Sequence, residues 1–123
     1  MRIDGGQSLI DFVAFEGAVI DSLARLNTDN AYFVRFANGI GATDRHALQT
    51  EIFFVRTALA KRHELNATPV PYGRGRLDAF GQIFNAVAAD FLAIPANKRV
   101  PDAPVSYPVM WDASHLDLVQ WNG

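Results

Sequence analysis

The chain has 123 residues, the length of one domain, and 50% of them are hydrophobic, nine being phenylalanine, so an apolar core can form. The formal net charge of −2 and the scattered basic residues argue against nucleic acid as a partner. The chain has no cysteine, which excludes disulfides and cysteine-ligated metals within it, and no apolar run long enough to span a membrane.

Hydrophobic periodicity predicts a mainly α fold with about four helices, two of them in the first third of the chain. Ser8 is a favourable N-cap, and the apolar residues that follow it at helical spacing predict a helix over about 8–26. A polar break that ends at Asp29 precedes a second predicted helix over about 30–38. Gly39 is expected to end that helix, because glycine adopts the backbone conformations that close a helix.

Two further helices are predicted over about 44–65 and 77–92. His63 falls in the last turn of the third helix, where a positive charge suits the helix dipole. The fourth helix has a clear apolar stripe, which predicts that its phenylalanines belong to the core. The glycine within it, Gly81, is either tolerated there or reflects the close approach of another segment or a ligand. The stripe consists of Leu77, Phe80, Phe84, Val87 and Phe91.

After the fourth helix the sequence predicts an irregular, aromatic-rich C-terminal arm. Four prolines between 95 and 108 remove backbone donors and disfavour helix. Both tryptophans, Trp111 and Trp121, belong to this arm. The chain stops at Asn122 and Gly123, a turn pair that normally leads into another element, and it has no secretion-signal pattern at its start. The sequence therefore favours an incomplete piece of a larger protein.

Two stretches allow a chemical function and also a plain structural one. Asp112 and His115 could pair as an acid–base dyad or could make a local turn bond. Gly73 to Arg76 could cradle an anion at the start of the fourth helix, or could form a simple loop in which Arg76 bonds Asp78 or a backbone carbonyl. The three histidines lie far apart in sequence and form no recognisable metal-binding pattern.

The C-terminal half of the sequence also resembles a known family. The matching residues keep a common order and spacing, and the resemblance extends over nearly the whole chain. They are Pro71-Tyr72-Gly73, Gly75-Arg76-Leu77-Asp78-Ala79, Ala103-Pro104-Val105-Ser106-Tyr107-Pro108, Trp111-Asp112 and Val119-Gln120-Trp121-Asn122-Gly123. These pieces resemble the large bacterial di-haem c-type cytochromes, relatives of the di-haem cytochrome c peroxidases and of the haem-containing rubber oxygenases.

The resemblance implies haem c as cofactor, although this chain departs from the family pattern. Members of the family attach haem through Cys-x-x-Cys-His, and this chain has no cysteine. The opening Arg-Ile-Asp-Gly-Gly resembles the stretch just after the first attachment site of the family. The resemblance therefore places one haem before Met1 and one after Gly123. Residues 1–123 would then form a single helical region that packs between flanking haem domains of one parent chain.

The resemblance also implies roles for individual residues. In related di-haem enzymes a tryptophan between the haems assists electron transfer, which makes Trp111 the candidate here, with Tyr107 and Arg76 as further candidates for haem contact. The parent would be an exported or periplasmic oxidoreductase of peroxidase or oxygenase type, and this segment alone would not be an enzyme. The alternative is a helical scaffold or interaction domain without cofactor, in which Trp111 anchors the arm to the core.

Overall fold

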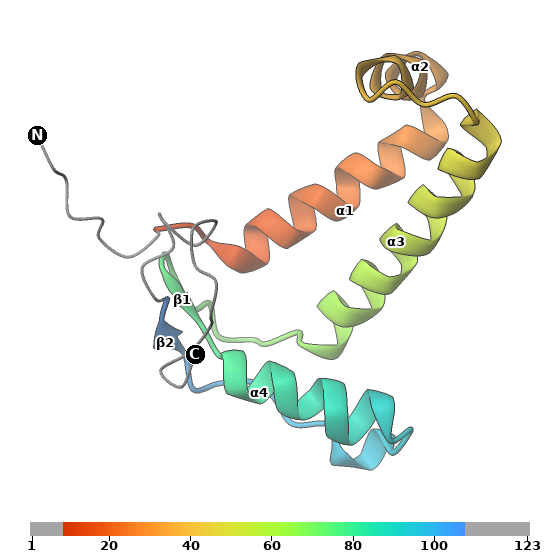
Figure 1. The fold of residues 1–123 in the computed structure, drawn as a ribbon. Helices are drawn as coiled ribbons and strands as arrows, with labels where there is room; N and C mark the ends of the chain where they lie inside the picture. Colours follow the sequence, from red (N-terminus) through yellow and green to blue (C-terminus); the bar gives the residue numbers. More distant parts are fainter. Residues whose placement is uncertain (1–8, 108–123) are drawn as a thin grey trace, which may run out of the picture.

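A computed structural model describes residues 9–107 of the chain. Three long helices dominate it: α1 (Phe12–Thr28), α2 (Asn30–Gly39) and α3 (Arg45–Leu65). α1 and α3 pack against each other and run in opposite directions, while α2 lies across the end where they are joined (Figure 1). The predicted mainly α class, with about four helices, is confirmed. None of the helices in the described part has the length and apolar character needed to cross a membrane.

Aspartates begin the helices, because their carboxylates accept N–H groups that the first helical turn leaves unpaired. The first helix starts at Phe12, so its predicted start at residue 8 was wrong, and Ser8 itself lies outside the described residues. The N-cap of this helix is Asp11, three residues after Ser8, the N-cap that the sequence suggested. Each capping aspartate accepts the backbone N–H of the residue three positions later. The pairs are Asp11 with Ala14 at 3.0 Å, Asp29 with Tyr32 at 3.0 Å, Asp44 with Ala47 at 2.9 Å, and Asp78 with Gly81 at 2.8 Å.

The fourth predicted helix is composite. It begins as α4 (Ala79–Phe84), continues as a π-helix, η1 (Asn85–Phe91), and is followed by a short 3₁₀ turn, η2 (Pro95–Asn97). Its predicted start at residue 77 was wrong, because Asp78 is the N-cap and the two residues before it form a strand, β1 (Arg76–Leu77). β1 pairs antiparallel with β2 (Val105–Ser106), so the arm that was expected to be irregular contains a strand.

The apolar core is small and lies where α1, α2 and α3 meet. It consists of Leu26, Phe33, Ala37 and Ile52. The prediction that the phenylalanines form the core was wrong, since seven of the nine are at least 39% exposed. The exposed ones are Phe15, Phe36, Phe53, Phe54, Phe80, Phe84 and Phe91.

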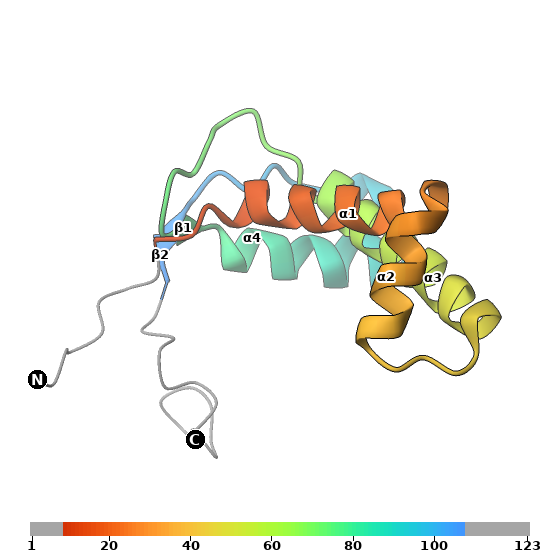
Figure 2. The same ribbon diagram turned by 90° about the horizontal axis from the view of Figure 1, so that it is seen from above.

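Buried polar side chains hold the first part of the arm against α4 and η1. Asn85 is fully buried and makes a two-way bond with the backbone of Arg99, accepting from its N–H at 2.8 Å and donating to its carbonyl at 2.7 Å. Tyr72 donates its hydroxyl to the Pro101 carbonyl at 2.6 Å. α1 and α4 both start beside the two-stranded sheet and extend from it in similar directions (Figure 2). The sheet therefore gathers both ends of the described chain at one end of the molecule.

Gly81 shows why a glycine stands inside α4. A Cβ added there would lie 2.5 Å from the Asp78 Oδ2 atom and 2.9 Å from the Pro101 Cβ atom. Both distances are shorter than van der Waals contact, so only glycine fits without a shift of its neighbours. Of the two explanations left open by the sequence, close approach of another segment is confirmed.

Candidate functional site

Two of the three residues predicted to contact haem lie together at the sheet. Arg76 pairs with Ser106 in the strand register, and the next residue, Tyr107, donates its N–H to the Gly75 carbonyl at 3.0 Å. The two candidates are 31 positions apart in sequence, and only strand pairing makes them neighbours. Trp111 lies outside the described residues, as does the predicted pair of Asp112 and His115.

The Tyr107 hydroxyl is buried but has no hydrogen-bond partner of normal geometry among residues 9–107. Burial is the main reason that the pKa of Tyr107 is raised, and the negative charge of Asp11 adds to the effect, while the nearby Phe12 N–H partly opposes it. A buried hydroxyl without a partner is costly, and such groups are usually satisfied by a ligand, a water molecule or a further chain segment. Tyr107 is thus ready to donate a hydrogen bond at the edge of the described structure.

Arg76 is exposed, and within the described residues its side chain makes neither of the two bonds expected of it in a simple loop. The Asp78 carboxylate instead accepts the N–H groups of Gly81 and Ala103, at 2.8 and 3.0 Å. This carboxylate occupies the N-terminus of α4, the position at which Gly73 to Arg76 could have cradled an anion. A carboxylate or phosphate from outside the described residues could pair with the exposed Arg76 guanidinium.

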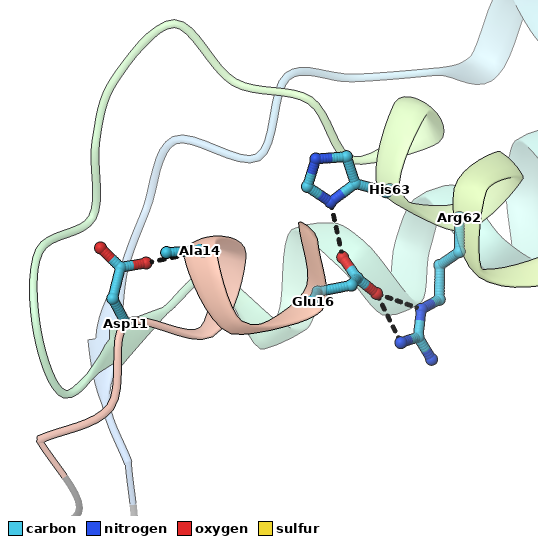
Figure 3. A network of polar contacts seen from close by, with 5 residues as sticks. All are labelled: Asp11, Ala14, Glu16, Arg62 and His63. Carbon is cyan, nitrogen blue, oxygen red and sulfur yellow. Dashed lines mark hydrogen bonds and ion pairs between the residues drawn. The ribbon is translucent and has the colours of Figure 1, made fainter. Parts of the chain in front are cut away.

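A second polar cluster joins α1 to α3, and the sequence analysis did not anticipate it (Figure 3). Glu16 is only 8% exposed. One of its oxygens accepts from Arg62, through Nε at 2.9 Å and through Nη2, and the other lies 3.0 Å from Nδ1 of His63. His63 was predicted to be a cation at a helix end; the structure adds a specific carboxylate partner 47 residues away. The pattern that could have revealed Glu16 is its place on the apolar stripe of α1, four residues after Phe12.

A small cavity of about 130 Å³ adjoins this cluster. Five of the seven residues that line it have polar side chains, and the lining residues come from α1, the end of α3, the turn after it, and α4. The lining residues are Val13, Glu16, His63, Asn66, Ala67, Thr68 and Gln82.

The other prominent surface is apolar and follows α4 and η1. We call the exposed residues Phe80, Ile83, Phe84, Val87 and Phe91 the phenylalanine face. Phe80 is 78% exposed and Phe91 is 83% exposed. The helical spacing that predicted a stripe is therefore correct, but the stripe does not face the core of this chain. Exposed apolar surface of this extent is typical of a site that contacts another protein segment, a membrane or a flat ligand.

The chemistry of these residues fits contact with haem and does not fit its attachment. The chain has no cysteine, and the described residues contain no group of three side chains that could hold a metal ion. What it offers a porphyrin is apolar area on the phenylalanine face, the Arg76 guanidinium for a propionate, and the Tyr107 hydroxyl, the last two without a partner in the described part of the chain.

Comparison with known proteins gives one similar sequence of undetermined function. The chain is 32% identical, over an alignment of 133 residues, to the uncharacterized protein y4iJ of Sinorhizobium fredii (strain NBRC 101917 / NGR234). The alignment includes 99% of this chain and 22% of that protein, so the chain spans about a fifth of the length of its relative. No known protein family matches the chain. No solved structure matches it either.

Proposed function

We propose that this chain is a helical segment that packs between two haem sites of a di-haem c-type cytochrome and attaches neither haem itself. The observation that carries the proposal is the phenylalanine face, which leaves large aromatic side chains exposed on α4 and η1. The residues just before α4, Gly75 to Ala79, belong to the sequence that resembles these cytochromes. The length of the Sinorhizobium relative agrees with a segment that belongs to a larger protein.

The proposal assigns a role to each part of this surface. The phenylalanine face excludes water and packs against flat, apolar groups. Arg76, exposed and unpaired within the described residues, would pair with a haem propionate, because a guanidinium binds a carboxylate through two parallel bonds. Tyr107 would donate its buried hydroxyl to a neighbouring acceptor. Haem, where bound, supplies the electron transfer or the peroxidase- or oxygenase-like chemistry, and this chain supplies position and surroundings.

Trp111 is the residue proposed to assist electron transfer between the haems. It follows Tyr107 by four positions and belongs to the part of the sequence that resembles the di-haem enzymes. An indole is large, flat and polarizable, which suits it to lie against a porphyrin. The proposal also places the parent protein outside the cytoplasm, as the resemblance implies.

A second candidate is an interaction segment that binds an apolar protein surface without cofactor. One observation favours it: α3, outside the best-matching part of the sequence, also exposes aromatic side chains. Phe53 and Phe54 form an edge-to-face pair with ring centres 5.8 Å apart, and both are more than half exposed. A partner on that side would contact α3 and not α4.

The test uses the full-length protein that contains this segment, produced in a host that matures c-type cytochromes. We expect a Soret band and two covalently bound haems per chain. Replacing Trp111 with Phe should slow the reduction of the second haem in stopped-flow experiments while the thermal unfolding curve remains cooperative. Absence of haem would overturn the proposal in favour of the interaction segment. Unchanged reduction rates in a less stable Trp111→Phe protein would show that Trp111 only anchors the arm.

A further inference from the structure

The cavity beside Glu16, Arg62 and His63 has a charge arrangement that points to a ligand. Both oxygens of the Glu16 carboxylate are already engaged, one by Arg62 and the other by His63. Glu16 therefore cannot receive a cation or a donor from the cavity without losing a partner. Its charge is balanced by Arg62, so the protonation state of His63 decides whether the cluster is neutral or positive.

His63 is held with one ring nitrogen committed and the other free. Nδ1 lies 3.0 Å from the Glu16 carboxylate, to which it donates. The second ring nitrogen, Nε2, points away from Glu16 in Figure 3. Because a carboxylate beside Nδ1 keeps the proton on that nitrogen, Nε2 is the ring nitrogen left to contact a ligand. His63 is one of the residues that line the cavity, and in the imidazolium form Nε2 would also be a hydrogen-bond donor.

Two neighbouring side chains in the cavity wall add further donors. Asn66 uses its carbonyl oxygen to accept from the Asn85 amide at 3.4 Å, which leaves the NH₂ group of Asn66 to donate. Thr68 accepts the Val70 N–H at 3.2 Å through its hydroxyl oxygen, which leaves the hydroxyl proton free. Donors on several sides with no free carboxylate are the features of a site for an anionic oxygen ligand.

The charges around His63 also favour an anionic ligand. Of the residues that line the cavity, only Glu16 of α1 and His63 of α3 have ionisable side chains. The lining residues from the turn after α3 and from α4 have none. Behind them, Arg62 pairs with Glu16, and Lys98 donates to the Glu64 carbonyl at the end of α3. When His63 is protonated, the Glu16–Arg62–His63 cluster carries a net charge of +1. A single negative charge would balance it.

We infer that this cavity binds a carboxylate, held by hydrogen bonds from the side chains of His63, Asn66 and Thr68. A cavity of about 130 Å³ suits a carboxylate on a short carbon chain. This group could come from a free small acid, or from an aspartate or glutamate elsewhere in a longer parent protein. The site does not depend on haem, so it stands whether or not the proposed function holds.

The test is a titration of the isotope-labelled chain with sodium acetate, followed by NMR on the histidine side chains, with sodium chloride at equal ionic strength as the reference. His46, on the same helix, is the internal control. Acetate should shift the His63 resonances in a saturable way and leave the His46 resonances unchanged. Equal responses to acetate and chloride in both the 123-residue chain and the full-length protein would overturn the inference.

Two further measurements distinguish the two possible sources of the carboxylate and test Thr68 in the cavity wall. If the carboxylate belongs to the parent protein, acetate will act on the 123-residue chain and lose its effect on the full-length protein, where the site is already filled. If the ligand is a free acid, acetate will act on both. Thr68→Val removes the free hydroxyl with little change of shape and should weaken acetate binding severalfold. Thr57→Val, which removes a hydroxyl bonded to the Phe53 carbonyl on exposed α3, should leave acetate binding unchanged.

Discussion

Asp78 is the residue on which the junction of β1, α4 and the arm depends. It is buried, and its two oxygens accept different N–H groups, that of Gly81 in its own helix and that of Ala103 in the arm. One side chain thus begins α4 and fastens a segment 25 residues away. The close packing of Pro101 beside Gly81 follows from this contact, because the arm is pulled against the first turn of the helix.

Gly81→Ala should therefore lower the free energy of unfolding by about 1–3 kcal/mol, since the new methyl group would displace the capping carboxylate and crowd Pro101. The matched control is Gly17→Ala in α1, where an added Cβ meets no atom within 4 Å. That change should stabilise the protein by about 1 kcal/mol, because alanine favours helix over glycine. Chemical denaturation followed by circular dichroism measures both. A stabilising Gly81→Ala would show that the arm does not pack there.

In the helices, the residues that form an apolar stripe in the sequence are not the residues that are buried in the structure. α3 has 21 residues, of which Ile52 is the buried one, while Phe53 and Phe54 beside it are exposed. The phenylalanine face on α4 and η1 has a regular apolar spacing and no covering element within the described residues. Helical periodicity shows that a face will be covered by something; it does not show that the cover belongs to the same chain.

Phe84→Ala should accordingly cost less than about 1 kcal/mol in the 123-residue chain, because Phe84 is already 47% exposed. The sequence alone predicts about 3–5 kcal/mol for the same change, the usual cost in a core. Ile52→Ala is the contrasting variant, with an expected loss of about 2–5 kcal/mol, since Ile52 is 5% exposed. In the full-length protein the cost of Phe84→Ala should rise if the face is covered there. Equal costs for the two variants in the 123-residue chain would contradict the fold described here.

The molecule as a whole has an apolar end and a polar end. Leu26, Phe33, Ala37 and Ile52 form the core where the three long helices meet, whereas buried polar groups connect the loop, the arm and α4 at the other end. Tyr72 is one such group, 7% exposed and bonded to the Pro101 carbonyl. Burial raises the pKa of Tyr72, and the charge of Asp78 raises it further, against a smaller opposing effect of Gln82.

The raised pKa values of Tyr72 and Tyr107 predict that the protein loses stability at alkaline pH. The folded protein holds the phenolic protons of Tyr72 and Tyr107 more tightly than the unfolded chain does, so their contribution is complete below about pH 10 and is lost as the pH rises through the raised pKa values. Thermal unfolding measured between about pH 8 and pH 11 should show the decline. Tyr72→Phe should reduce this pH dependence while lowering stability by about 1 kcal/mol at neutral pH through loss of the Pro101 bond. A transition temperature that stays constant across this range would contradict both pKa shifts.

The sequence by itself determined the number and type of the main helices, because helical periodicity, aspartate caps and glycine or proline breaks are local properties of the backbone. It misplaced two helix starts, at Phe12 and Ala79, where an apolar residue before the true cap extended the pattern. Only the tertiary structure decided which faces are buried, because burial depends on area supplied by distant segments.

The candidate sites divide in the same way. Residue types and their resemblance to a family singled out Arg76 and Tyr107, and strand pairing then made them neighbours. The Glu16–His63 contact joins residues 47 positions apart and depends on the packing of α1 against α3, a choice among many possible partners that local sequence does not encode. Likewise, the phenylalanines could be recognised as an apolar stripe from their spacing, whereas their exposure followed from the absence of a partner within residues 9–107.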